Sequence, residues 1–203
     1  MLGRTTTHLV AAVMAAALWT GTGAAEARDV RVSEATRFYA ISGRTPADFA
    51  AAMSRNGPFS GQHRRRVWAT ASRTMRYRLD RRRQGGRCRV TRAEVTLKID
   101  YTMPRLRGRV AGAARTKWNR MYKILNRHER VHGRYYKDLA KQTQAALARI
   151  KPQRSCASLD TVAARIVQRL SRKNQALNDR FDRNDRRNYR RMERLYAARR
   201  PSS

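Results

Sequence analysis

The sequence predicts an α+β fold in which a small antiparallel sheet packs against two long helices. Three observations lead to this prediction. Apolar and polar residues alternate over two segments between residues 67 and 101, which is the two-residue period of a strand. Apolar residues then recur at steps of three, four or seven between residues 116 and 150, as on one face of a helix. A second apolar series with helical spacing follows Pro152.

Residues 1–27 have the composition of a secretory signal peptide and are set aside from the fold. Arg4 gives a positive start, residues 9–19 form an alanine-rich apolar run, and Ala25-Glu26-Ala27 is a small-x-small cleavage site. The run is too short for a typical spanning helix, although a retained membrane anchor is the alternative. We therefore expect a mature chain that begins at Arg28, has no transmembrane segment and is periplasmic or secreted.

The mature chain opens with a predicted strand and a short helix. Val30, Val32, Phe38, Tyr39 and Ile41 suggest a strand within residues 30–43. The segment Thr45-Pro46-Ala47-Asp48 predicts the start of a helix, with Thr45 as its N-cap and proline in its first turn. Asn56-Gly57-Pro58 ends that helix.

Two further strands form a predicted antiparallel hairpin. Residues 67–79 and 88–101 alternate in polarity, and residues 80–86, which end in two glycines, predict the turn between them. Met103-Pro104 is expected to end the sheet. The region from Gly108 to Gly112 leads into the next element.

The second half of the chain predicts two long helices. No proline interrupts residues 116–150, and Pro152 stops this run. Gly133 is its weak point and costs about 1 kcal/mol relative to alanine. A second helix is expected over residues 159–181, returning alongside the first. The arginine-dense tail over residues 183–203 is expected to be helical or frayed.

The chain contains two cysteines, Cys88 and Cys156. An even pair in an exported protein usually forms a disulfide. A bridge here would close a long loop that contains the helix over residues 116–150. It would stabilise the fold by about 4 kcal/mol in the chain-entropy account. Two buried free thiols are the alternative.

Residues 128–132 read His-Glu-Arg-Val-His, which is the H-E-x-x-H motif of zinc peptidases. Two histidines four residues apart on a helix lie one turn above each other, so both rings can bind one Zn²⁺. Glu129 between them can reach a water at that ion. The alternative is that His128 and His132 are two partly buried polar residues without a metal.

A catalytic zinc site needs a third protein ligand and an open position. No histidine follows His132, so this ligand must be a carboxylate or His63, which stands in an arginine run upstream. Asp138 lies six residues after His132. On an unbroken helix that is about 240° around the axis, so Asp138 should face away.

Asp182 is the third ligand that we expect. It directly follows Phe181, an inward-facing position of the returning helix, and it comes close to the motif if the two helices pack antiparallel. Asp185 on the same helix and Glu193 in the basic tail are alternatives, as is His63.

The net charge of the chain is +33, and 40 of its 47 basic residues are arginine. Such a surface binds polyanions with strong salt dependence, among them lipopolysaccharide, acidic phospholipid and nucleic acid. No basic stripe interleaved with aromatic residues is evident, so nucleic acid is the less favoured partner. The alternative is a compositional preference for arginine with no particular partner.

Several short motifs follow one another along the chain. They are Phe38-Tyr39-Ala40-Ile41-Ser42-Gly43, Thr45-Pro46, Asn56-Gly57-Pro58, Trp68-Ala69-Thr70, Cys88, Met103-Pro104, Trp118 and H-E-x-x-H. This order resembles the DUF922 family, described as predicted secreted zinc-dependent proteases, over about residues 36–188. The resemblance implies a metallopeptidase domain over residues 28–182, followed by the basic tail over residues 183–203.

The sequences of this family look to end in a segment similar to Tyr-Asp-x-x-Thr-x-His-Gly. This chain agrees at Phe181 and Asp182 but has Asp185 where the threonine stands and Arg187 where the histidine stands. If that histidine is the third ligand of the family, this chain has lost it. The resemblance then implies that Asp182 or Asp185 substitutes, or that the site is degenerate.

Together these observations predict an exported zinc metallopeptidase that hydrolyses peptide or protein substrates. The two histidines and Asp182 would hold Zn²⁺, and Glu129 would act as general base on an activated water. Tyr135, or else Tyr136, would donate a hydrogen bond to the tetrahedral oxyanion. The alternative is a catalytically degenerate, strongly basic secreted protein that binds anionic envelope polymers or nucleic acid.

Overall fold

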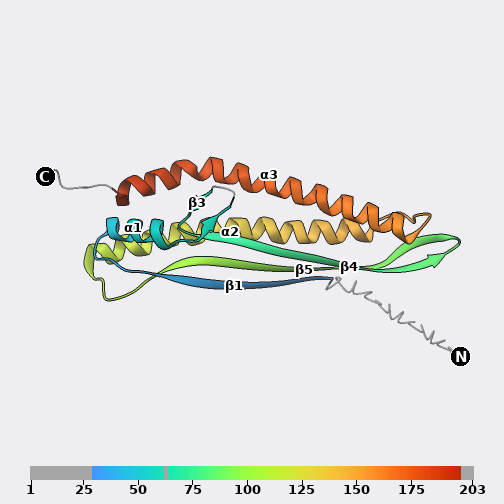
Figure 1. Cartoon of the computed structure of the whole chain (residues 1–203), viewed down its shortest axis with the longest axis horizontal. Coiled ribbons are helices and arrows are strands. Elements are labelled where there is room, and N and C mark those ends of the chain that lie inside the picture. Colours follow the sequence, from blue (N-terminus) through green and yellow to red (C-terminus); the bar gives the residue numbers. More distant parts are fainter. Residues whose placement is uncertain (1–28, 62–63, 198–203) are drawn as a thin grey trace, which may run out of the picture.

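The structure is a computed structural model that describes residues 29–61 and 64–197, with side chains described up to residue 192. The expected signal peptide over residues 1–27 lies outside the described residues. A long three-stranded sheet, helix α2 (Gly112–Ala148) and helix α3 (Cys156–Ala197) lie in successive layers (Figure 1). Helix α1 (Pro46–Asn56) lies beside α2 at one end (Figure 1). The α+β class predicted from the sequence is confirmed.

The central strand of the sheet is β5 (Arg87–Leu106), flanked by β4 (Thr70–Gln84) and β1 (Val30–Ile41). β4 pairs with β5 in the antiparallel direction, as expected. β1 pairs with β5 in parallel, so the sheet is mixed and not purely antiparallel as the sequence suggested. A second, two-stranded sheet pairs β2 (Phe59–Ser60) with β3 (Arg65–Arg66).

Two strand boundaries differ from the predicted ones. The turn expected over residues 80–86 shrinks to Gly85-Gly86, whose φ angles of 57° and 72° suit a two-residue hairpin turn that glycine favours. β5 does not end at Met103-Pro104. Proline is tolerated there because β4 begins opposite Thr102, so beyond that point β5 pairs on one side alone.

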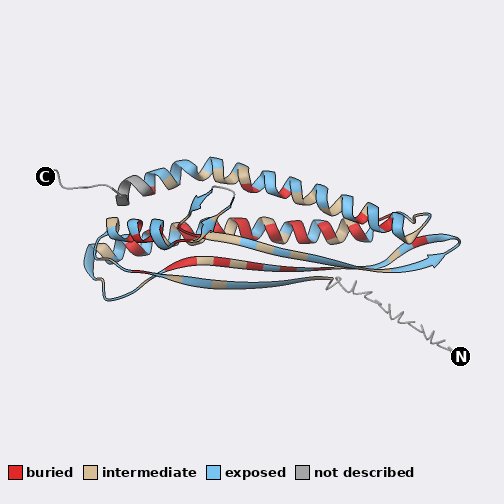
Figure 2. Ribbon diagram, in the orientation of Figure 1, coloured by how far each residue is buried: buried red, intermediate tan, exposed pale blue. Residues whose placement is uncertain are grey.

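The core lies between the sheet and α2. The inward face of β5 is fully buried and consists of Ala93, Val95, Leu97, Ile99, Tyr101 and Met103. This confirms the alternation predicted for that strand. Figure 2 shows buried residues along β5 and α2, whereas the outward surface of α3 is mostly exposed. No helix in the described ranges is long and apolar enough to span a membrane.

Helix α1 begins as the sequence predicted. The Thr45 hydroxyl accepts a hydrogen bond from the Asp48 backbone N–H at 3.2 Å, and the Asp48 carboxylate accepts one from the Thr45 N–H at 2.9 Å. This reciprocal capping box satisfies two of the amide groups that a helix start leaves without partners. Phe49 and Met53 are the fully buried residues that fix α1 to the core.

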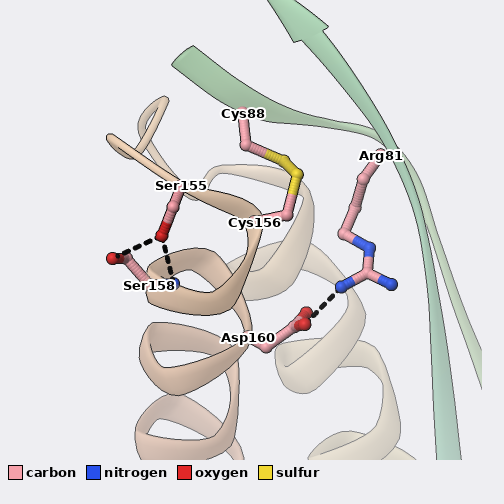
Figure 3. The surroundings of a disulfide bond; sticks show 6 residues. All are labelled: Arg81, Cys88, Ser155, Cys156, Ser158 and Asp160. Carbon is pink, nitrogen blue, oxygen red and sulfur yellow. Dashed lines mark hydrogen bonds and ion pairs between the residues drawn. A yellow bond between two sulfur atoms is a disulfide. The ribbon is translucent and has the colours of Figure 1, made fainter. Parts of the chain in front are cut away.

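The disulfide between Cys88 and Cys156 is present, with the two Cα atoms 5.1 Å apart. It joins the first residues of β5 to the first residue of α3 (Figure 3). The backbone of Cys88 also exchanges two hydrogen bonds of 2.8 Å with Gln153, and Arg81 pairs with Asp160. The start of α3 is therefore held to the hairpin by covalent, hydrogen-bonded and ionic contacts.

Helix α3 is longer than the sequence predicted. The Ser155 hydroxyl accepts a hydrogen bond from the Ser158 backbone N–H at 3.0 Å, a typical N-cap contact (Figure 3). The helix then continues to Ala197 and passes without a break through the domain boundary expected between residues 182 and 183. The arginine-rich segment is thus helical as far as the structure describes it.

Gly133 lies in α2 where Tyr101 of β5 approaches the helix. A Cβ atom at this position would lie 2.0 Å from the Tyr101 Oη atom. The ring is held there because its hydroxyl donates to Glu34 at 3.1 Å and the Arg130 guanidinium lies 4.1 Å from its centroid. The close approach explains why a glycine stands in the middle of a long helix.

Replacing Gly133 with alanine should lower the free energy of unfolding by about 1–3 kcal/mol, because overpacking outweighs the better helix propensity of alanine. Changing Tyr101 to phenylalanine in that variant removes the clashing atom and should restore part of the loss. Urea denaturation of the two single variants and the double variant measures the coupling. A G133A protein more stable than the wild type would contradict the close approach.

Candidate metal centre

Three side chains converge where α2 and α3 face each other. The Oδ1 atom of Asp182 lies 3.0 Å from the Nε2 atom of His132 and 3.3 Å from the Nε2 atom of His128. The two Nε2 atoms are 3.1 Å apart. The structure thus brings together the three residues expected from the sequence as zinc ligands, and their donor atoms all lie within 4.8 Å of one another.

The opposite nitrogen of each ring has its own hydrogen-bond acceptor. The Nδ1 atom of His128 lies 2.7 Å from the Asp185 carboxylate, and that of His132 lies 2.6 Å from the Asn178 amide oxygen. The Asn178 amide nitrogen donates to the Asn174 carbonyl at 2.7 Å, which fixes its oxygen toward His132. Both Nδ1 atoms therefore carry a hydrogen, as is common for the outer nitrogen of a metal-binding histidine.

With a hydrogen on each Nδ1, neutral rings leave both Nε2 atoms as lone-pair acceptors. Two such nitrogens and a carboxylate oxygen then face one another with no donor between them. Such an arrangement is repulsive unless a cation occupies the centre. The donor set therefore fits a metal ion, and two imidazoles with one carboxylate are ligands that zinc accepts.

The same geometry shifts the pKa values of His128, His132 and Asp182. Burial alone would lower the pKa of His128 and of His132, but the neighbouring polar and acidic groups together outweigh burial and raise both pKa values, with the hydrogen bond to Asp182 as the largest raising contribution. Burial would likewise raise the pKa of Asp182, yet the two histidines, which donate hydrogen bonds to Asp182 when their rings are protonated, hold that pKa well below its usual range. In the absence of a metal, the proton is the cation that this centre attracts.

Glu129 lines the same cavity but is not part of the converging set, which consists of His128, His132 and Asp182. It is 4% exposed, and the Ala71 backbone N–H lies near enough to favour its charged form. Burial raises the pKa of this carboxyl group. A buried carboxylate beside the ligands, but separate from them, is suited to proton transfer.

A cavity of about 460 Å³ gives access to these groups. His128, Glu129, His132 and Asp182 all line it. One wall is the extended segment over residues 67–71, which leads into β4, and another is the facing side of α3. The centre is therefore open to a ligand on one side.

Aromatic rings hold the two histidines in place. The Phe181 ring lies 4.7 Å from the His128 ring and 5.2 Å from the His132 ring, and the Tyr189 ring lies 4.8 Å from that of His128. The sequence placed Phe181 on the inward face of α3. It did not identify Tyr189 or Asn178, although Asn178 stands one helical turn before Asp182 and so shares its face.

Of the two tyrosines expected near the site, Tyr136 lines the cavity and Tyr135 does not. The Tyr136 hydroxyl donates to the Ala71 carbonyl at 3.2 Å. The Tyr135 ring instead packs edge-on against Phe181, with centroids 6.1 Å apart. Tyr136 follows His132 by four residues and therefore continues the buried side of α2.

The remaining candidate ligands have other roles or are not described. Asp138 is exposed, as the helical geometry predicted. Asp185 supports His128 from the far side of its ring. Arg187, which stands where the family pattern has histidine, is exposed and does not line the cavity. His63 and the side chain of Glu193 lie outside the described residues.

Two carboxylates compete for the role of third ligand, and substitution separates them. Changing Asp182 to asparagine should nearly abolish zinc binding, because it removes a ligand. Changing Asp185 to asparagine should weaken binding about 10- to 100-fold, because it removes a contact that orients His128. Competition with a chromophoric chelator measures both affinities, and Asp179 to asparagine on the same helix is the control. The reverse order of D182N and D185N would assign the ligand to Asp185.

Comparison with known proteins identifies the family of this chain. No curated protein and no solved structure was found to match it. The family described as "Bacterial protein of unknown function (DUF922)" matches residues 36–188, a range that contains β4, β5, α1, α2 and every residue of the converging set. The chain therefore belongs to the DUF922 family.

Proposed function

We propose that this protein is a zinc-dependent metallopeptidase that acts outside the cytoplasm. The observation that carries the proposal is the convergence of two Nε2 atoms and one carboxylate oxygen beside the buried Glu129 in an open cavity. When bound, zinc supplies a Lewis acid that polarises a substrate carbonyl and lowers the pKa of water.

The number of ligands supports a catalytic site over a structural one. His128, His132 and Asp182 offer one donor atom each, and structural zinc sites normally have four protein ligands. Three ligands would leave a coordination position for substrate or solvent, and the cavity gives access to the centre. Asp185 and Asn178 orient the two rings so that both Nε2 atoms point inward.

Glu129 is the proposed general base. It takes the proton of the water that attacks the scissile carbonyl and passes it to the leaving amine, so the proton is conserved through the cycle. Burial raises the pKa of its carboxyl group, which makes the carboxylate a stronger base.

Tyr136 is the proposed donor to the oxyanion, in place of Tyr135. Tyr136 lines the cavity, and burial raises the pKa of its hydroxyl, so the hydroxyl stays protonated and can donate. In the resting structure the hydroxyl donates to the Ala71 carbonyl. To reach a substrate, it must exchange that acceptor for the developing oxyanion.

Two features support action outside the cytoplasm. The composition of residues 1–27 is that of a signal peptide. The Cys88–Cys156 disulfide is of the kind that persists in oxidising compartments.

Replacing Glu129 with glutamine should leave zinc affinity unchanged and lower kcat by about 10²- to 10⁴-fold, because the variant keeps the ligands and loses the base. Proteolysis of an unfolded protein substrate and zinc stoichiometry are measured on the same samples. Glu94 to glutamine, on the outer face of the sheet, is the matched control. Wild-type rates in E129Q would refute this role of Glu129, and a wild type without zinc-dependent cleavage would refute the proposed function.

A second proposal concerns the exposed arginines around the turn between β4 and β5. Arg82, Arg83, Arg87 and Arg89 are all exposed around Gly85-Gly86, at the end of the sheet where α3 begins. We propose that this tip binds an anionic envelope polymer and thereby tethers the enzyme.

Changing these four arginines to glutamine should lower the salt concentration that elutes the protein from a heparin column, and should do so more than four such changes spread over α3. Equal shifts for the two sets would mean that total charge alone decides binding and that the tip has no special role.

A further inference from the structure

Three arginines line the cavity beyond the converging set. Arg65 comes from β3, and Arg186 and Arg190 come from α3. All three are exposed to solvent. Among the side chains that the structure describes, none of these three arginines forms an ion pair, and Asp182 and Asp185 pair with the histidines instead. Of the cavity's two carboxylates, Asp182 is engaged by the two histidines, and Glu129 is 4% exposed.

The positions of the α3 arginines relative to the metal centre follow from helix geometry. Arg186 is four residues after Asp182 and Arg190 is eight residues after it, so all three share one face of the helix. At 1.5 Å per residue, the two arginines lie about 6 and 12 Å beyond Asp182 along the axis. An extended peptide advances about 3.3–3.6 Å per residue. A substrate lying along α3 would therefore present side chains two to four residues from the scissile bond to these guanidinium groups.

The chemistry of these groups selects an anion. A guanidinium binds a carboxylate through two parallel N–H···O hydrogen bonds, a stronger contact than either group makes with neutral partners. A divalent ion at the centre together with three arginines leaves the cavity positively charged despite Glu129 and Asp182. A lysine or arginine side chain of a substrate would meet like charge there and be disfavoured.

We infer that the cavity selects peptides that carry aspartate or glutamate two to four residues to one side of the scissile bond, bound by Arg186 and Arg190. This inference rests on the proposed peptidase function of the same site. Arg65 approaches from the β2–β3 hairpin and adds a third cation to the cavity wall.

Arginine is abundant throughout this chain, so a control must separate the cavity from the general charge. Arg183 and Arg187 provide it. Each follows a cavity-facing residue of α3 by one position, which turns it about 100° away. Both are exposed, and neither lines the cavity. Reversing the charge of either pair changes the net charge of the protein by the same amount.

The test uses binding to the full-length, zinc-loaded E129Q protein, because binding does not require hydrolysis. Labelled peptides with glutamate, glutamine or lysine at one position are compared by fluorescence anisotropy at physiological salt. We expect glutamate to bind about ten-fold or more tightly than glutamine when placed two to four residues from the bond. R186E together with R190E should abolish this preference, whereas R183E together with R187E should retain it. Stoichiometric zinc binding by both variants verifies an intact centre.

Two outcomes would overturn the inference. One is an E129Q protein with no preference for glutamate, and the other is an equal loss of preference in both charge-reversed pairs. Its failure is distinguishable from that of the proposed function. A wild type that cleaves all three peptides alike is a peptidase without this selectivity. Selective binding by E129Q, combined with no cleavage by the wild type, would retain the recognition and refute the peptidase.

Discussion

The site depends on three electron-rich atoms that face one another at 3.0–3.3 Å. Asp185 and Asn178 accept hydrogen bonds from the far nitrogens of the two rings, so the near nitrogens have lone pairs directed at the Asp182 oxygen. Only a cation makes such a centre favourable, because unpaired acceptors and a partly buried carboxylate otherwise repel one another. The contact between α2 and α3 therefore includes this polar cluster as well as apolar side chains.

The geometry of the centre also depends on the distant end of α3. The disulfide and the Gln153 hydrogen bonds fix residue 156 against the hairpin. Asp182 follows 26 residues later, about 39 Å along the helix at 1.5 Å per residue. Because a continuous helix has a set rise and rotation, fixing its start constrains which residue lies opposite His132. In this way the disulfide contributes to the position of a candidate metal ligand far from it.

Local patterns in the sequence predicted the parts of this arrangement that depend on one element alone. His128, Glu129 and His132 follow from helical spacing, and the buried face of β5 follows from alternation. The parallel pairing of β1 was missed because it joins segments about 65 residues apart, which no local pattern encodes. Tyr135 was preferred over Tyr136 because one apolar stripe was taken as the buried side of α2. That helix packs against both the sheet and α3, so its buried side is wider and includes Glu129 and Tyr136.

Electrostatic interactions at the cavity act over two different distances, by direct contact and at long range. Of the 14 acidic residues in the chain, Glu129, Asp182 and Asp185 gather at this one site, which the abundant arginines around it make less costly. The same arginines repel a divalent cation, so a metal at this site would have to be bound by direct coordination and not by the field of the protein. An anionic peptide experiences the opposite force and is attracted from a distance. The proposed metal site and the proposed preference for acidic peptides are therefore compatible in a strongly basic chain, because the two interactions act over different distances.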